Sequence, residues 1–357
     1  MPSFDADAKP LLIGSLPLED HGQAVAEVLR HTLAIPSWPQ LPVYPQEGMV
    51  VQFLPGFPGV KQADGKVFID TDSDQFEAEL LSFYESYLAA SEDPTAEAAA
   101  CFALNPEVSK GFFELLKQLK SGPAPLTAVK GQITGPFTFA TGLTDQDGRA
   151  VFYNDQLRDA AVKLLALKAR WQVAQLKQFQ VPVIVFLDEP ALAGFGSSEF
   201  ISVSKEEVSA CLREVAEAVT AEGALVGIHV CANTDWSVAF EAGFNIVNFD
   251  AHGYFDKFVL YEDQLKGFLQ NGGILAWGIV PTLDAEAVEA ETSDSLTESW
   301  LKKARIIEGL GFDAQLIRRQ SLITPSCGMG SLSLDLARKV LSLTENVSDR
   351  IRNSYGQ

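Results

Sequence analysis

The residues best suited to chemistry in this chain are His229, Cys231 and Cys327. His229 and Cys231 stand two positions apart at the end of an apolar run. On a β-strand, side chains at positions i and i+2 point to the same side, so this imidazole and thiolate can reach one ion. Taken alone, the spacing is more typical of a core histidine beside a buried thiol. A further ligand is needed before it indicates a metal site.

Cys327 supplies that further ligand. It lies in the turn 324–330, directly after another apolar run, where Gly328 and Gly330 free the backbone to present the sulfur. Two thiolates and one imidazole suit zinc, and a carboxylate or an exchangeable ligand completes the tetrahedron. Ligands spread over separate strand ends are typical of a catalytic zinc, whereas the ligands of a folding zinc usually come in close pairs.

The sequence leaves the fourth ligand open. Asp250 ends the apolar run that follows the His-x-Cys run, so its carboxylate is one candidate. His252 competes with it, because the same i, i+2 spacing applies to Asp250 and His252. Water is the third alternative, and it would leave a position that a substrate can take.

These residues depend on the strands that precede them. Near-continuous Val/Ile/Leu runs alternate with amphipathic stretches, which is typical of parallel strands covered by helices on both faces. The predicted strands are 11–15, 98–104 (the weakest), 126–132, 182–187, 225–230, 245–249, 273–279 and 321–324. The predicted helices are 155–179, 205–221, 236–242, 261–271 and 293–310. This order predicts an α/β fold whose parallel sheet is closed or wound by right-handed crossovers. Of these we expect the closed form, a (β/α)8 TIM barrel forming a single domain over residues 1–357.

One stretch interrupts the alternation. Residues 35–75 contain many prolines and glycines among aromatic residues that include Trp38, Tyr44, Phe53 and Phe57. This composition is too aromatic for a disordered linker. We therefore predict an ordered insertion within the barrel domain.

Polar residues recur at the carboxyl ends of the predicted strands. Asp188 and Glu189 follow one strand, and the three metal-binding candidates and Asp250 follow others. In a barrel all these ends converge on one face, where active sites are built. The sequence therefore predicts one site that combines the metal ligands with the two carboxylates.

The set of motifs resembles a known superfamily. It comprises cobalamin-independent methionine synthase (its C-terminal catalytic domain), zinc-dependent thiol methyltransferases acting with corrinoid proteins, and uroporphyrinogen decarboxylase. The shared motifs span nearly the whole chain in the family's order: Ile13-Gly14-Ser15, Thr134-Gly135-Pro136, Asp188-Glu189-Pro190-Ala191-Leu192, His229-x-Cys231 and Pro325-x-Cys327-Gly328.

This resemblance implies roles for individual residues. His229, Cys231 and Cys327 match zinc-ligand positions, and Asp250 stands where the synthase carries a ligating glutamate, on a shorter side chain. Asp188 matches the aspartate that receives the amino group of homocysteine, and Ser15 lies at a position near its carboxylate. Glu189 is a further substrate-binding candidate, with a structural role as helix cap or arginine partner as the alternative.

The function implied is that of an S-methyltransferase in methionine biosynthesis or in a cobalamin-dependent pathway. It would move a methyl group from a methylcorrinoid protein, or another methyl carrier, to a thiol such as homocysteine. The chain has about half the length of the full synthase and lacks its N-terminal folate-binding domain, which favours a corrinoid donor. Two alternatives remain: a zinc-bearing, non-catalytic partner of a corrinoid protein, and a decarboxylase. The latter is disfavoured because residues 11–20 contain no arginine to bind porphyrin carboxylates.

Charge and cysteine content narrow the setting. The formal net charge is −20, and such a surface repels nucleic-acid phosphates and anionic lipids. The four cysteines are scattered, and no secretory signal opens the sequence. We therefore expect a cytoplasmic protein that binds a thiol substrate and a methyl carrier, but neither nucleic acid nor membrane.

Overall fold

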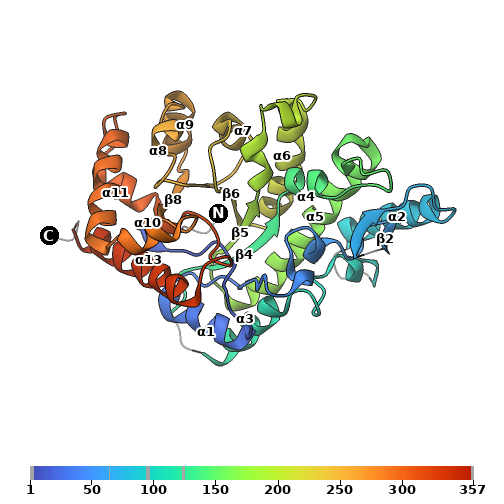
Figure 1. The fold of residues 1–357 in the computed structure, drawn as a ribbon, viewed down its shortest axis with the longest axis horizontal. Helices are drawn as coiled ribbons and strands as arrows, with labels where there is room; N and C mark the ends of the chain where they lie inside the picture. Colours follow the sequence, from blue (N-terminus) through green and yellow to red (C-terminus); the bar gives the residue numbers. More distant parts are fainter. Residues whose placement is uncertain (1–3, 64, 94–96, 123–124, 355–357) are drawn as a thin grey trace.

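A parallel β-sheet forms the centre of the fold in the computed structural model, which describes residues 4–63, 65–93, 97–122 and 125–354 (Figure 1). The sheet is curled and contains seven strands in the order β1-β9-β8-β7-β6-β5-β4. The strands are β1 (Lys9–Pro10), β4 (Val129–Thr134), β5 (Val183–Asp188), β6 (Leu225–Val230), β7 (Ile246–Phe249), β8 (Ile274–Val280) and β9 (Ser321–Pro325). Predicted strands overlap six of these, and the strand predicted at 11–15 begins one residue after β1 ends. The α/β class with a parallel sheet is confirmed.

The two edges of this sheet are spanned by a segment that is not a regular strand. In it, Ser37 forms an isolated parallel bridge with Lys130 of β4, and Gln40 forms one with Ser15, beyond β1. Pro36 and Pro39 lie in this segment and lack the N–H that a continuous ladder requires. The sheet therefore has seven strands, and a closed barrel of eight regular strands is not formed.

Two predictions for the first third of the chain, the strand 98–104 and the insertion 35–75, have different outcomes. The strand predicted at 98–104 is wrong: a 3₁₀-helix, Glu97–Phe102, begins there, in an alanine-rich stretch without β-branched residues. The predicted insertion, 35–75, contains the antiparallel hairpin β2 (Val60–Ala63) and β3 (Lys66–Ile69), while residue 64 is outside the described residues. Its first residues are those that bridge the sheet edges.

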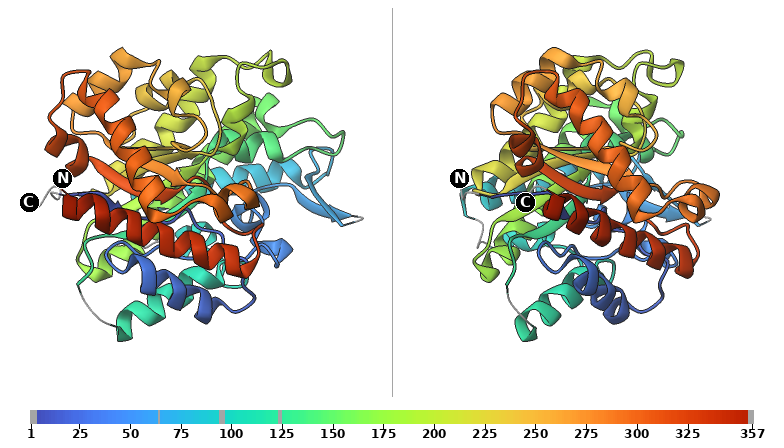
Figure 2. Two further views of the ribbon diagram at one scale, coloured as in Figure 1. Left: turned by 60° about the vertical axis from the view of Figure 1, so that its left-hand side comes forward. Right: turned by 90° about the vertical axis from the view of Figure 1, so that its left-hand side faces the viewer.

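Helices surround the sheet (Figure 1). All five predicted helices are present, with ends that differ by no more than a few residues. The α-helices are α1 (His21–Thr32), α2 (Phe76–Glu92), α3 (Lys110–Ser121), α4 (Pro136–Gly142), α5 (Asp155–Leu176), α6 (Lys205–Ala221), α7 (Trp236–Glu241), α8 (Phe255–Phe258), α9 (Glu262–Gln270), α10 (Ala285–Ala290), α11 (Ser293–Glu308), α12 (Ala314–Arg319) and α13 (Leu334–Ser354). Near the two chain ends, α13 packs beside α1, so distant parts of the sequence lie together (Figure 2).

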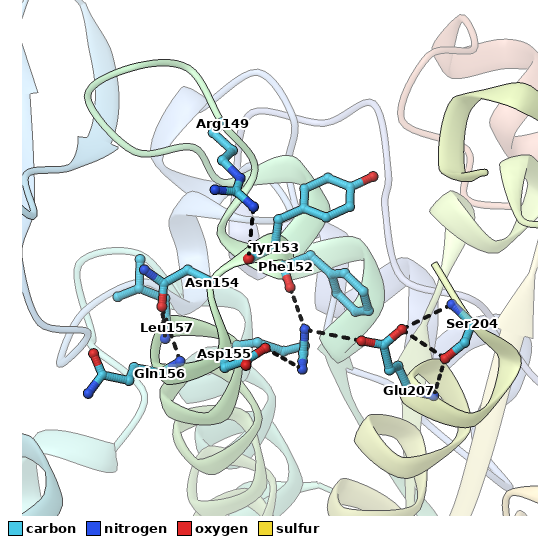
Figure 3. A network of polar contacts seen from close by, with 10 residues as sticks. Arg149, Phe152, Tyr153, Asn154, Asp155, Gln156, Leu157, Ser204 and Glu207 are labelled. Carbon is cyan, nitrogen blue, oxygen red and sulfur yellow. Dashed lines mark hydrogen bonds and ion pairs between the residues drawn. The ribbon is translucent and has the colours of Figure 1, made fainter. Parts of the chain in front are cut away.

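The starts of α5 and α6 show how the sequence sets helix ends (Figure 3). The Asn154 side chain caps α5 by accepting from two backbone N–H groups of its first turn. Ser204 and Glu207 form a reciprocal capping box at the start of α6. Arg158 joins the two ends: it donates to the Phe152 carbonyl at 2.8 Å and lies 3.6 Å from the Glu207 carboxylate. These contacts fix the two helices that pack on β4, β5 and β6.

Apolar side chains fill both sides of the sheet. The larger cluster lies between the strands and the helices. A smaller one fills the concave side and includes Ile184, Phe186, Leu225, Ile246 and Leu322. Because strand side chains alternate, the next inward positions along these strands are occupied by polar residues at the carboxyl ends. On the concave side, the small apolar cluster therefore lies below a layer of polar residues at the carboxyl ends of the strands.

No helix in the described part of the chain is both long enough and apolar enough to cross a membrane.

A buried lysine in α5 gives a first stability prediction. The Lys168 side chain is fully buried, and its Nζ donates to the Ala103 carbonyl at 3.3 Å. Burial lowers its pKa to about 8. The folded-state pKa is depressed, so the ionised lysine destabilises the fold below pH 8, and this cost disappears as pH rises towards 10.5. Lys168→Met should raise the free energy of unfolding at pH 7 by up to roughly 3 kcal/mol.

Urea unfolding at pH 7 and pH 10 measures this effect, with a smaller gain expected at pH 10. Lys163→Met is the matched control on the same helix, because Lys163 forms ion pairs with Asp159 at 2.6 Å and Glu214 at 3.3 Å. That control should lose stability, by less than about 1 kcal/mol. A Lys168→Met protein less stable than wild type at pH 7 would contradict the prediction.

A glycine in α3, Gly111, gives a second stability prediction. A Cβ on Gly111 would lie 1.9 Å from the backbone oxygen of Pro39, in the segment that bridges the sheet edges. Gly111→Ala should therefore destabilise the protein by about 1–3 kcal/mol through overpacking. In α9, a Cβ on Gly267 would meet no atom within 4 Å, so Gly267→Ala should instead stabilise by roughly 1 kcal/mol. Thermal melting of both variants tests this: the melting temperature should fall in Gly111→Ala and rise in Gly267→Ala.

Candidate metal centre

The three predicted ligands meet at the carboxyl edge of the sheet. The metal-binding atoms of His229, Cys231 and Cys327 all lie within 4.8 Å of one another. His229 is the penultimate residue of β6, Cys231 follows β6, and Cys327 follows β9. Since β7 and β8 lie between these strands in the sheet, its curvature brings the ligands together. Among the described residues, this is the group of His, Cys, Asp and Glu side chains that can hold a metal ion.

The side chains of Cys231 and Cys327 are hydrogen-bonded to each other. The Cys327 thiol donates a hydrogen bond to Cys231 and, with the neighbouring His229 ring, holds the pKa of Cys231 at about 4. The same hydrogen bond, together with burial, raises the pKa of Cys327 far above its usual value. One thiolate, one thiol and one imidazole at such close range form a donor set that a thiophilic divalent metal binds, with release of the thiol proton. The residues present therefore fit a metal of the zinc type.

A cavity of about 400 Å³ opens onto this group. Its wall includes all three metal-binding residues and Ser15 and Asp188 from the predicted site. The other residues on the wall are Ile13, Gln40, Pro42, Glu47, Gly48, Met49, Pro190, Leu283, Gly328, Gly330 and Ser331. The described wall thus contains carboxylates but no lysine or arginine. Most of its surface is apolar, which suits a small substrate with few charged groups.

Asp188 faces this cavity from the end of β5. Its side chain is 7% exposed, and within the described residues its Oδ1 has no hydrogen-bond partner. Burial raises the pKa of Asp188, and the charges of Lys130 and His229 partly offset the effect. A buried carboxylate oxygen without a partner is costly, unless a donor on a ligand pairs with it. The Oδ1 of Asp188 is therefore an acceptor without a partner among the described residues, at the wall of the cavity.

Ser15 connects the start of the chain to the Cys327 turn. Its Oγ accepts a hydrogen bond from the Gly330 N–H at 3.2 Å, and its carbonyl accepts one from Met329 at 2.9 Å. A Cβ on Gly328 would lie 2.1 Å from the Ser15 Oγ, so glycine is required for this approach. These contacts hold Ser15 beside the Cys327 turn, on the wall of the cavity.

The two candidates for a fourth ligand, Asp250 and His252, both lie in other contacts. Asp250 is not in the group of clustered ligand atoms; its Oδ1 accepts the Gly253 N–H at 2.7 Å and so caps the turn after β7. His252 Nε2 lies 3.2 Å from the Glu291 carboxylate instead. Neither residue completes the metal site in this conformation, because each is engaged in a local contact.

Glu189 has a structural role. Its two oxygens accept hydrogen bonds from the Phe137 and Thr138 N–H groups at 2.9 and 2.8 Å, and the Thr138 hydroxyl adds a third at 2.6 Å. These bonds satisfy the N-terminus of α4, while burial raises the pKa of Glu189 to about 7. Glu189 is absent from the described cavity wall, so the helix-cap alternative replaces the substrate-binding one.

Two residues near the site were not identified from the sequence. Lys130 is fully buried beneath Asp188 and donates to the Ile13 carbonyl at 2.6 Å and to Gln132 at 2.8 Å. Asn248 is also fully buried and its Oδ1 contacts Nδ1 of His229. The sequence signal that could have identified them is a polar residue within a predicted strand. Lys130 is such a residue in 128–133, and Asn248 is one in 246–249.

No protein-family model matches the chain, and no curated protein is similar enough to count as a relative.

Proposed function

We propose that this protein is a zinc-dependent S-methyltransferase that transfers a methyl group from a methylcorrinoid protein, or a similar methyl carrier, to a small thiol. The observation that carries the proposal is the His229, Cys231 and Cys327 group on the wall of the 400 Å³ cavity. Within the described residues, no fourth His, Cys, Asp or Glu side chain joins the group. A three-ligand set beside a cavity is the arrangement of catalytic zinc sites, which keep one position for substrate.

Zinc bound there would favour the thiolate form of a thiol substrate, the form that attacks a methyl group. The chain's own residues bind and orient that substrate. Asp188 accepts a hydrogen bond from the ammonium group of an amino-thiol such as homocysteine, through its Oδ1, which has no partner among the described residues. Ser15 lies on the same wall and offers its hydroxyl to the other end of the substrate. The apolar wall limits water around the reacting sulfur.

The proposal extends to the fold. We propose that the chain is a variant (β/α)8 barrel in which the segment around Ser37 and Gln40 takes the place of one regular strand. Its isolated parallel bridges to Lys130 and Ser15 support this, since they connect the β4 side of the sheet with the β1 side. A cavity at the carboxyl ends of the strands is also where barrel enzymes place their active sites.

The test begins with metal analysis of the purified protein, followed by methyl transfer from free methylcobalamin to a panel of thiols. The panel contains homocysteine, cysteine, coenzyme M and 2-mercaptoethanol. About one zinc per chain and transfer to a thiol with an amino group would support the proposal. Stoichiometric zinc without transfer to any thiol would favour the non-catalytic corrinoid partner. Absence of metal binding would overturn both.

A further inference from the structure

We propose that Asn248 is a positioning residue that fixes the tautomer of His229, so that Nε2 of the imidazole is the nitrogen presented to the metal. This inference rests on the proposed metal centre for its consequence, but the tautomer itself is a property of the metal-free chain.

The orientation of the Asn248 amide is decided by its surroundings. Its Nδ2 lies 2.8 Å from the carbonyl oxygen of Ala276 and 2.8 Å from Oγ1 of Thr324. A backbone carbonyl can only accept a hydrogen bond, so the NH₂ group must face Ala276. The amide oxygen therefore faces the other way, towards His229.

The tautomer of His229 follows from this orientation. The Asn248 Oδ1 can only accept, so Nδ1 of His229 must carry the proton. In a neutral imidazole the lone pair is then on Nε2. His229 is also hydrogen-bonded to Cys231, and because Nδ1 is engaged by Asn248, Nε2 is left for the side of the ring that faces the thiols. When the ring is neutral, its metal-binding lone pair is thus set before any metal arrives.

The backbone holds this arrangement in place. Asn248 pairs in register with His229 on β6 and with Ala276 on β8. Its second acceptor, Thr324, is on β9, three residues before Cys327. One fully buried amide thus connects the strands that carry the histidine and the second cysteine. Partners of this kind behind a ligating histidine typically contribute 10- to 100-fold to metal affinity.

Nuclear magnetic resonance of protein labelled with ¹⁵N-histidine tests the tautomer directly. The chain has four histidines, so the ring signals can be assigned by single substitutions. In the metal-free wild type, we expect one histidine, lost in His229→Gln, with its proton on Nδ1. In Asn248→Leu, a side chain of similar size without an acceptor, the same ring should show a mixture of tautomers.

Zinc affinity, measured by competition with a chromophoric chelator, provides the second readout. Asn248→Leu should bind zinc about 10- to 100-fold more weakly than wild type. Thr324→Val is the matched control: it removes one acceptor of Nδ2 but leaves the Asn248 oxygen and Ala276 in place, so the tautomer should persist. A wild-type ring whose Nδ1 carries no proton would overturn the inference, whether or not Asn248→Leu folds. So would an unchanged tautomer and zinc affinity in Asn248→Leu.

The two proposals fail separately in this design. A wild-type protein that binds no zinc contradicts the proposed function, while the ring spectrum of the same metal-free sample still decides the tautomer.

Discussion

Cys231→Ser and Cys327→Ser should each release the bound metal and reduce methyl transfer to the uncatalysed background. Each substitution removes one of two sulfur ligands and leaves a hydroxyl, which is a poor ligand for a thiophilic ion. Loss of an outer partner alone costs 10- to 100-fold, so loss of a ligand should exceed about 100-fold. Metal content by mass spectrometry and methyl transfer from methylcobalamin are measured on the same preparations.

The chain supplies its own controls. Cys211 is buried in α6, where desolvation raises its pKa to about 11, and Cys101 is exposed. Neither lies on the described cavity wall, so Cys101→Ser and Cys211→Ser should retain metal and turnover. Stoichiometric zinc in both Cys231→Ser and Cys327→Ser would show that the metal is bound elsewhere.

Asp188→Asn should weaken substrate binding and at the same time stabilise the protein. The substitution removes the charge that pairs with an ammonium group, which is worth roughly 1.5–3 kcal/mol, so KM for the thiol acceptor should rise about 10- to 100-fold. It also removes a buried carboxylate whose Oδ1 has no partner in the described structure. The free energy of unfolding should therefore increase by about 1–3 kcal/mol in the absence of substrate.

Steady-state kinetics with varied acceptor and urea unfolding without acceptor provide the two measurements. Asp313→Asn is a control for the same chemical change, because Asp313 caps α12 and is not on the described cavity wall. It should leave KM unchanged and lower stability slightly through loss of the cap. An Asp188→Asn enzyme with unchanged KM would remove Asp188 from the substrate site.

The strand periodicity made much of this arrangement predictable. Apolar runs located six of the seven sheet strands, and polar residues at or after the strand ends located the candidate metal ligands. The spacing could not predict that residues 36–40 bridge both sheet edges. Their prolines interrupt the strand pattern in the sequence, although the backbone still forms isolated bridges there. Nor could the spacing predict that Asp188 and Glu189 have different roles. Adjacent residues at a strand end point to opposite sides, and only the fold shows which side is the cavity and which is the α4 N-terminus.

Asn248 and Lys130 were missed for a related reason. A single polar residue within an apolar run lowers a hydrophobicity pattern only slightly, and nothing local reveals its partners. Those partners lie elsewhere in the chain: the Ala276 carbonyl on β8 for Asn248, and the Ile13 carbonyl, three residues after β1, for Lys130. Contacts between residues far apart in sequence are decided by sheet order, which the strand pattern alone does not specify.

The contact between Ser15 and the Cys327 turn has a consequence for the biosynthesis of the protein. Ser15 and Gly330 are 315 positions apart, and β1 pairs with β9. During translation, β1 must therefore wait until residues 321–325 have left the ribosome before its partner strand is available. Neither the cavity wall nor the complete ligand set can exist on a shorter nascent chain. A nascent chain that stops before Cys327 therefore cannot hold a metal through the full set of His229, Cys231 and Cys327.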